Sequence, residues 1–179
     1  MAFPPPGALR TLYDPSQIRA RVEELGRRIT ADYEGHSLVL VCVLKGSFVF
    51  AADLARAIAL PLRVEFLGVQ SYGNGTESTG VVQITQDLTR PLDGEDVLVV
   101  EDIVDTGLTL TYIADLLRQR RSRSVKVCAL LEKPSRLKSP IQVDYIGFTI
   151  DDVFVVGYGL DCAQQYRNLP EIAELLTPP

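Results

Sequence analysis

The sequence predicts an α/β protein in which helices flank a doubly wound, mainly parallel sheet. Apolar runs of strand length alternate with segments whose apolar residues recur at helical spacing, and this alternation is typical of strand-helix-strand units. The strand-length runs are continuous, as in parallel strands that are covered on both faces. The 179 residues are 46% hydrophobic, which is enough to build a sizeable core. We expect residues 1–179 to form a single domain.

The first predicted helix covers residues 14–29. Asp14 followed by Pro15 resembles an N-cap with proline at the first helical position. An apolar stripe at helical spacing supports the assignment; it consists of Ile18, Val22, Leu25 and Ile29. The segment is therefore predicted to be an amphipathic helix.

Two further elements follow at once. The continuous apolar run "SLVLVCVL", residues 37–44, is predicted to be a strand. Residues 48–59 have helical periodicity, and the helix should end near Pro61. Together these segments form one strand, turn and helix unit.

A pair of strands is predicted around a polar segment. Residues 62–69 and 81–88 are rich in β-formers. The glycine-rich stretch between them, residues 70–80, is too long for a tight hairpin turn. We interpret it as a mobile flap.

The second half of the chain continues the alternation. Residues 97–101 are a predicted strand and residues 124–131 another. The predicted helix between them has an apolar stripe of Leu110, Ile113, Ala114 and Leu117. Residues 143–161 supply more strand-like pieces, and residues 168–176 are predicted to close as a short helix or turn.

Composition excludes several classes of function. A formal net charge of -5 and a pI near 4.9 argue against nucleic-acid binding. No apolar run has the length of a membrane span, and the prolines of "MAFPPPGALR" interrupt the apolar stretch that a signal peptide needs. We expect a cytoplasmic protein that binds neither nucleic acid nor membrane.

Cysteine and histidine are too sparse for several kinds of site. Cys42, Cys128 and Cys162 are odd in number and far apart, which favours neither a disulfide framework nor a zinc site. Cys42 and Cys128 are predicted to be buried thiols. His36 is the single histidine and lies in the polar turn "YEGHS", where we expect a solvated residue. Histidine-dependent triads are excluded.

Three carboxylates crowd the end of the strand at residues 97–101. Glu101, Asp102 and Asp105 lie within five residues of one another. Carboxylates are seldom buried unless they are paired, hydrogen-bonded or bound to a metal. Because ligands of parallel sheets bind beyond the carboxyl ends of strands, this cluster predicts a ligand with hydroxyl groups or a cation.

The loop after the acids can hold an anion. Thr106, Gly107 and Thr109 bring hydroxyls and a permissive backbone to a predicted helix start, where N–H groups and the helix dipole favour phosphate. A phosphorylated ribose fits both halves of the segment. The alternative is a solvated strand end with a capping turn. Neither a G-x-G-x-x-G nor a G-x-x-x-x-G-K-[ST] motif is present.

The stretch "VLVVEDIVDTGLTL" resembles the phosphoribosyl pyrophosphate signature of type I phosphoribosyltransferases, in the form of the hypoxanthine-guanine branch. The likeness extends from about Leu44 to Arg167. "LKGS" is similar to the pyrophosphate loop, "SYGNGTESTG" to the mobile flap, "LLEKPS" to the purine-contact lysine region and "FVVGYGLD" to the base-stacking segment. The resemblance implies the type I phosphoribosyltransferase fold with a small hood region. It also implies transfer of phosphoribosyl from phosphoribosyl pyrophosphate to a 6-oxopurine.

The resemblance implies how the ribose phosphate is bound. Glu101 and Asp102 would be the acids at the ribose hydroxyls and magnesium. The cradle of the 5-phosphate would consist of Asp105, Thr106, Gly107, Leu108 and Thr109. Leu108 departs from the pattern, because other members often have lysine there.

The pyrophosphate group has its own implied partners. Lys45 and Gly46 match the pyrophosphate loop, in which the peptide before the lysine is typically cis. Arg167 matches an arginine that contacts pyrophosphate. The flap would close over Ser71 and Tyr72 and exclude water.

Four residues are implied at the purine. Asp105 matches the aspartate by purine N7 that is the proposed general base or acid. Lys133 would hydrogen-bond the 6-oxo group, Phe154 would stack on the base, and Val155 would meet its edge through backbone groups. Preference among hypoxanthine, guanine and xanthine does not follow from the sequence.

Magnesium and self-association are implied as well. Mg²⁺ would be associated with Glu101, Asp102 and Asp161. Like its relatives, the protein would be a homodimer or homotetramer, and no interface is identifiable in the sequence.

Two rival functions make different demands on the same segment. An RNA-binding regulatory protein on this fold would be expected to show a basic face and need not keep Asp105, whereas this chain is acidic and has it. An aspartyl-phosphate phosphatase expects a D-x-D spacing near the first strand, whereas Asp102 and Asp105 are three apart and mid-chain. Nucleotide formation from phosphoribosyl pyrophosphate and hypoxanthine distinguishes all three functions.

Overall fold

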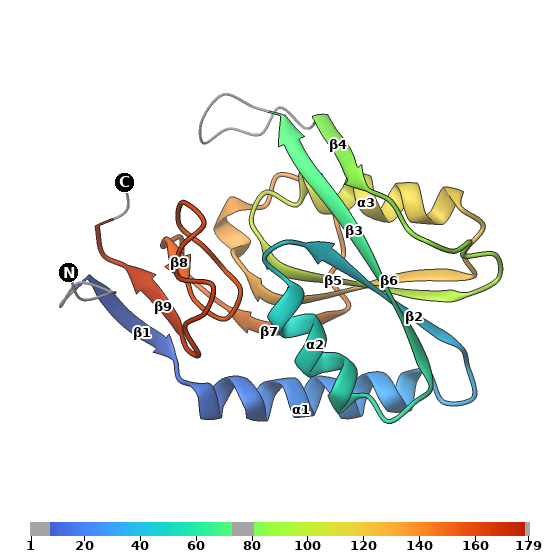
Figure 1. Ribbon diagram of the computed structural model, residues 1–179, viewed down its shortest axis with the longest axis horizontal. Coiled ribbons are helices and arrows are strands. Elements are labelled where there is room, and N and C mark those ends of the chain that lie inside the picture. The colour runs from blue at the N-terminus through green and yellow to red at the C-terminus, as the bar shows by residue number, and fades with distance from the viewer. Residues whose placement is uncertain (1–7, 73–80, 178–179) are drawn as a thin grey trace.

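The computed structural model describes residues 8–72 and 81–177, and its centre is a six-stranded sheet (Figure 1). The strand order is β4-β3-β2-β5-β6-β7. Five neighbouring strands run parallel: β3 (Leu62–Tyr72), β2 (Leu38–Leu44), β5 (Asp96–Val104), β6 (Ser124–Glu132) and β7 (Tyr145–Thr149). At the edge, β4 (Val81–Gln86) pairs antiparallel with β3. The predicted central strands are confirmed; residues 73–80 of the predicted flap lie outside the described residues.

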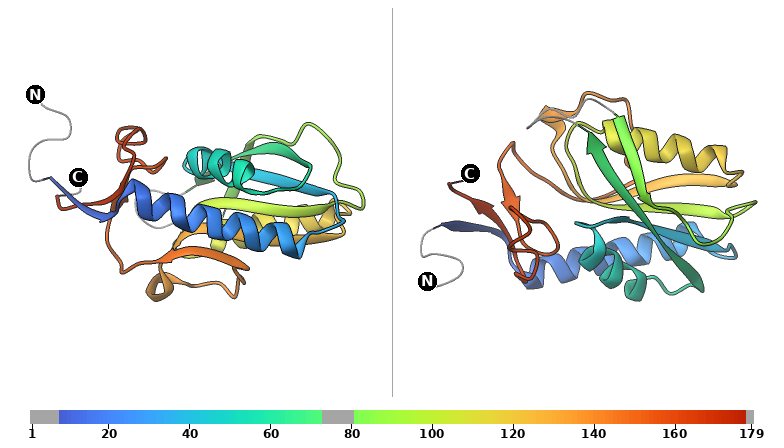
Figure 2. Two further views of the ribbon diagram at one scale, coloured as in Figure 1. Left: turned by 90° about the horizontal axis from the view of Figure 1, so that it is seen from below. Right: turned by 45° about the horizontal axis from the view of Figure 1, so that its top comes forward.

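Helices cover both faces of the sheet (Figure 2). α1 (Pro15–Asp32) and α2 (Phe48–Ala57) lie on one face, and α3 (Leu108–Gln119) lies on the other. Successive residues of β2 alternate between two cores: Leu40 packs with α1 and α2, whereas Val41 packs with α3. The doubly wound arrangement follows from strands that are apolar on both faces.

The first helix begins as the sequence predicts. The Asp14 carboxylate accepts the N–H of Gln17 at 2.9 Å, and the Gln17 side chain accepts the N–H of Asp14 at 2.9 Å. This capping box precedes Pro15 at the first helical position. Further along, a Cβ on Gly26 would lie 2.5 Å from the carbonyl oxygen of Ala57. Glycine at this position therefore lets α1 approach α2 closely.

A second, smaller sheet lies at one end of the molecule (Figure 1). We call it the hood sheet; it has the order β1-β9-β8 and consists of β1 (Leu9–Tyr13), β9 (Ile172–Leu175) and β8 (Val155–Val156). The prediction of a short helix or turn over 168–176 is wrong, because β9 pairs antiparallel with both neighbours. Tertiary pairing overrides local propensity here. β1 was not predicted.

The amino ends of the strands, opposite the candidate site, carry an ionic cluster around the buried Asp96. Asp96 accepts hydrogen bonds from Arg123 Nε at 3.0 Å, from Ser124 Oγ at 2.6 Å and from His36 at 2.9 Å. His36 was predicted to be solvated; it is half-exposed and bonded to Asp96. These partners, Arg123 first, hold the pKa of Asp96 well below its usual range.

Cys42 and Cys128 are buried free thiols, as predicted, and Cys162 is a third. No helix within 8–72 or 81–177 is both long and apolar enough to cross a membrane.

Candidate active site

The loop between β5 and α3 places the predicted acids beyond the sheet. β5 is longer than predicted and carries Glu101 and Asp102 within it. Gly107 caps α3 with a left-handed φ of 75°. A Cβ there would lie 2.8 Å from Ile141 Cγ2. Conformation and close packing therefore both favour glycine at the helix start.

Glu101 and Asp102, which we call the acid pair, place two carboxyl groups beside each other. Burial first, and the neighbouring Asp102 carboxylate second, raise the pKa of Glu101 well above its ordinary value. Its Oε2 is buried and has no hydrogen-bond partner in the described part of the chain. Such an oxygen is suited to accept from a substrate hydroxyl or to bind a cation.

The predicted pyrophosphate loop lies against the acid pair. The Leu44–Lys45 peptide is cis. Ser47 is fully buried, and its Oγ donates to the carbonyl of Val43 at 2.6 Å, which holds the loop between β2 and α2. A Cβ on Gly46 would lie 1.6 Å from Asp102 Oδ2. The loop backbone therefore touches the carboxylate directly.

These two loops enclose a cavity of about 270 Å³. It brings together half of the predicted site residues, namely Lys45, Gly46, Glu101, Asp102, Asp105, Thr106, Gly107 and Thr109. Its lining includes the carboxylates of β5 and the N-terminus of α3. A phosphorylated diol would match that distribution of groups.

A neighbouring segment supplies the predicted purine lysine. Lys133 is buried, and its N–H donates to the carbonyl of Val104 at 2.9 Å. Its Nζ lies 3.4 Å from Asp152 Oδ1. Arg136, three residues later, donates through Nε to Asp105 Oδ1 at 2.9 Å. Arg136 is not among the predicted site residues; its place in the "KPSR" segment after Lys133 was the available signal.

Four more predicted residues lie within residues 154–167, beside, in and after β8 of the hood sheet. Phe154 is 43% exposed, which leaves its ring available for stacking, and Val155 is buried in β8. Asp161 Oδ1 pairs with Arg167 at 2.6 Å. Arg167 also donates to the carbonyl of Gly159 at 2.8 Å.

A backbone contact joins the segment after β8 to the pyrophosphate loop. Gly159 has a φ of +102°, and a Cβ on it would lie 2.2 Å from the carbonyl oxygen of Gly46. Gly159 also donates its N–H to the carbonyl of Arg167 at 3.0 Å. Arg167 is thus linked to the pyrophosphate loop although it does not line the cavity of 270 Å³.

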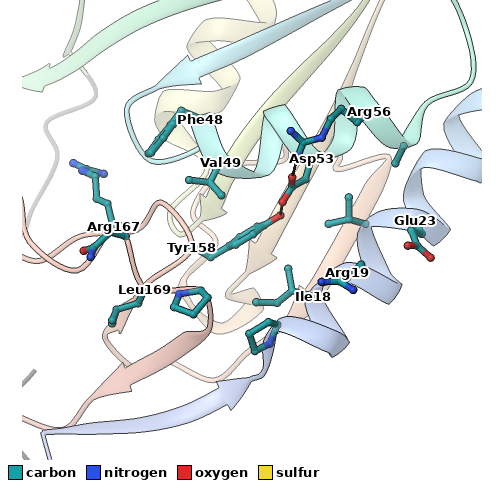
Figure 3. A pocket seen from close by; sticks show the side chains of 15 residues that line it. Ile18, Arg19, Glu23, Phe48, Val49, Asp53, Arg56, Tyr158, Arg167 and Leu169 are labelled. Carbon is teal, nitrogen blue, oxygen red and sulfur yellow. Dashed lines mark hydrogen bonds and ion pairs between the residues drawn. The ribbon is translucent and has the colours of Figure 1, made fainter.

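A larger cavity, of about 630 Å³, opens on another face between α1, α2 and the hood (Figure 3). Tyr158 Oη donates to Asp53 Oδ2 at 2.6 Å across it. Arg167 is the single predicted site residue in its lining. The strand-end acids and the phosphate loop are absent from that lining, so its size does not make it the candidate active site.

Some predicted residues are not brought together. Within the described residues no group of three or more His, Cys, Asp or Glu side chains is placed to hold a metal ion, so Asp161 does not join Glu101 and Asp102. Mg²⁺ commonly takes one or two carboxylates and completes its shell with substrate phosphates and water, which the acid pair fits. Ser71 and Tyr72 end β3 and pair with β4.

Comparison with known proteins identifies the family. Residues 9–163 match the model of the phosphoribosyl transferase domain. The chain belongs to the phosphoribosyltransferase family. The phosphoribosyltransferase motifs recognised in the sequence therefore lie mainly within the matched region, and Arg167 lies just beyond it.

Named phosphoribosyltransferases resemble the chain over most of its length. It is 45% identical to the hypoxanthine-guanine phosphoribosyltransferase of Bacillus subtilis, over 93% of the chain and 92% of the relative. It is 46% identical to the bifunctional protein TilS/HprT of Listeria innocua, over 93% of the chain but only 26% of that relative. The chain thus spans about a quarter of the length of the bifunctional relatives it matches.

A solved structure shows the same fold. The hypoxanthine phosphoribosyltransferase of Staphylococcus aureus superimposes with a TM-score of 0.91 at 46% identity, covering 94% of this chain and 92% of that one. The predicted type I phosphoribosyltransferase fold is confirmed.

Proposed function

We propose that this protein is a purine salvage enzyme. It transfers the 5-phosphoribosyl group from phosphoribosyl pyrophosphate to hypoxanthine or guanine, giving IMP or GMP and pyrophosphate. The observation that carries the proposal is the cavity lined both by the strand-end acids Glu101 and Asp102 and by the N-terminus of α3. The named relatives support the same assignment.

The ribose phosphate would bind along the β5–α3 loop. Glu101 and Asp102 accept from the ribose hydroxyls. The 5-phosphate is held by Asp105, Thr106, Gly107, Leu108 and Thr109, where helix N–H groups and the dipole favour anions. Negative carboxylates near the ribose also favour the positive charge that develops on the sugar as the bond to pyrophosphate breaks.

The purine would lie between the loop and the hood. Lys133 donates to the 6-oxo group, Phe154 stacks on the ring, and Val155 meets its edge through backbone groups. Asp105 exchanges a proton with purine N7. A half-exposed carboxylate beside the cavity is able to reach substrate without a large rearrangement.

The leaving pyrophosphate would be held from two sides. Lys45 and Gly46 contact it from the loop, Arg167 contacts it from the hood, and the flap closes over Ser71 and Tyr72. Glu101, Asp102 and Asp161 are the acids proposed to be associated with Mg²⁺, although they do not form one group in the described residues; the bound cation would neutralise charge on the pyrophosphate.

The cellular setting is proposed on the same basis. Residues 1–179 act as a single phosphoribosyltransferase domain in the cytoplasm, as a homodimer or homotetramer, without nucleic-acid or membrane partners. Light scattering coupled to gel filtration measures the assembly, and a monomer at micromolar concentration would contradict this part of the proposal.

One assay tests the activity. Purified protein, phosphoribosyl pyrophosphate, magnesium and hypoxanthine should give IMP and pyrophosphate in equal amounts. RNA gel shifts on the same sample test the RNA-binding alternative, against which the net charge of -5 weighs. RNA binding without nucleotide formation would replace the proposal with that alternative.

A further inference from the structure

A row of four alternating charges connects Lys133 and Asp105, two of the side chains proposed to contact the purine. Lys133 Nζ lies 3.4 Å from Asp152 Oδ1. Asp152 Oδ2 lies 3.8 Å from Arg136 Nη1. Arg136 Nε in turn donates to Asp105 Oδ1 at 2.9 Å. Arg136 therefore stands between two carboxylates and touches the one that borders the cavity.

The backbone fixes the position from which Arg136 reaches Asp105. On one side of Asp105, the carbonyl of Val104 accepts the N–H of Lys133 at 2.9 Å. On the other side, the carbonyl of Thr106 accepts the N–H of Lys138 at 3.0 Å. The segment that bears Arg136 is thus attached to the loop on both sides of the carboxylate. This attachment distinguishes the contact from an ordinary exposed ion pair, whose partners are free to separate.

We propose that Arg136 is a positioning residue that orients the carboxylate of Asp105 for proton exchange with the purine. The inference rests on the proposed role of Asp105. Arg136 donates to Oδ1, which fixes the plane of the carboxylate and leaves Oδ2 for the substrate. A side chain that is 42% exposed would otherwise sample several orientations, and proton transfer depends on alignment.

Arg136 remains a cation throughout any useful assay range. The hydrogen bond to Asp105, followed by its charge and that of Asp152, raises the pKa of Arg136 above its already high value. Its effect is therefore constant with pH, and steady-state constants at one pH suffice for a first test.

The test is a double-mutant cycle between Arg136 and Asp105. Arg136→Ala should lower kcat about three- to tenfold, the range that a half-exposed charge-assisted hydrogen bond supplies, and leave KM for phosphoribosyl pyrophosphate within about twofold. Arg136→Lys, which keeps the charge and a donor, should restore part of kcat. The double variant Arg136→Ala with Asp105→Ala should be no slower than Asp105→Ala alone, because Arg136 acts only through that carboxylate.

Arg118→Ala is the matched control. Arg118 also pairs with an aspartate, Asp115, at 2.8 Å, but on the exposed surface of α3. It should leave kcat unchanged, and equal melting temperatures of the variants confirm that they fold.

Three results would overturn the inference. In the first, the losses of kcat at the two positions multiply. In the second, Arg136→Ala leaves kcat unchanged. In the third, Arg136→Ala lowers KM for hypoxanthine without lowering kcat, as expected if the substrate must break the Arg136–Asp105 contact in order to bind. Asp105→Ala alone separates this inference from the proposed function. A normal kcat in Asp105→Ala removes the proposed role of Asp105. A low kcat in Asp105→Ala together with a normal kcat in Arg136→Ala rejects only the role of Arg136.

Discussion

Gly46 and Asp102 are in direct contact, so that a Cβ on the glycine would overlap the carboxylate oxygen at 1.6 Å. The loop that is proposed to hold pyrophosphate and the acid that is proposed to hold the ribose are thus placed relative to each other by one glycine. A side chain at position 46 must displace one of them.

Gly46→Ala should therefore lower the activity of the enzyme severely. Displacing a reacting group by about 1 Å can cost about 10²-fold in rate, so we expect a loss of that size in kcat/KM for phosphoribosyl pyrophosphate. Gly94→Ala is the control for backbone strain without overlap, because φ of Gly94 is +72° but a Cβ there meets nothing within 4 Å. Equal kinetics of the two variants would show that the contact with Asp102 has no functional weight.

Asp105→Ala should lower turnover far more than it raises KM for phosphoribosyl pyrophosphate. Proton transfer by a positioned group typically contributes about 10²–10⁴-fold. Single-turnover and steady-state rates with hypoxanthine measure the effect. Asp115→Ala, an exposed carboxylate of α3, should behave as the unchanged enzyme. A normal turnover number in Asp105→Ala would remove this residue from the chemistry.

Removal of divalent cations should abolish nucleotide formation, because the leaving pyrophosphate needs charge neutralisation. Glu101→Gln should raise the magnesium concentration needed for half-maximal activity, whereas Glu34→Gln, on the exposed turn after α1, should not. Titration of magnesium into chelator-treated protein gives both values. Full activity in excess chelator would contradict the roles of Glu101, Asp102 and Asp161.

Hypoxanthine and guanine should be substrates, and adenine should not. The ammonium of Lys133 has three donors and no acceptor, so it pairs with a 6-oxo group but meets the 6-amino group of adenine donor to donor. Sites built around such a bond discriminate by about 10⁴–10⁵-fold in kcat/KM. Adenine turnover within tenfold of hypoxanthine would mean that Lys133 does not read the 6-position.

Asp96→Asn should destabilise the fold by about 1–3 kcal/mol, because the buried carboxylate accepts from Arg123, Ser124 and His36. The pKa of Asp96 is lowered in the folded protein. Its contribution is therefore fully present above the unfolded value near pH 4 and is lost as the pH falls further. Urea unfolding at pH 7 and at lower pH measures both effects.

The control for Asp96 is Asp87→Asn. Asp87 pairs with Arg120 at 2.6 Å, but its side chain is 53% exposed. Exposed ion pairs contribute at most about 1 kcal/mol. If Asp96→Asn costs no more than Asp87→Asn, the cluster at the amino end of β5 does not stabilise the fold.

Local pattern was sufficient to predict the central sheet and the strand-end acids. Continuous apolar runs mark strands such as β2, and Glu101 and Asp102 stand out because they end one of them. Long-range contacts were not predictable in this way. The Arg136–Asp105 contact joins residues 31 positions apart, and no periodicity indicates it. The same holds for β9, whose short apolar segment is compatible with helix or strand until a partner strand decides between them.

The hood sheet also determines the order in which the molecule is completed. β1 (Leu9–Tyr13) is hydrogen-bonded to β9 (Ile172–Leu175) and to no other strand of the described residues. Chains emerge from the ribosome N-terminus first. β1 is therefore without its partner strand while β2 to β7 are synthesised and can assemble. Asp161 and Arg167 lie between β8 and β9. Nascent chains halted before residue 172 would therefore carry the strand that bears Glu101 and Asp102 without the hood sheet.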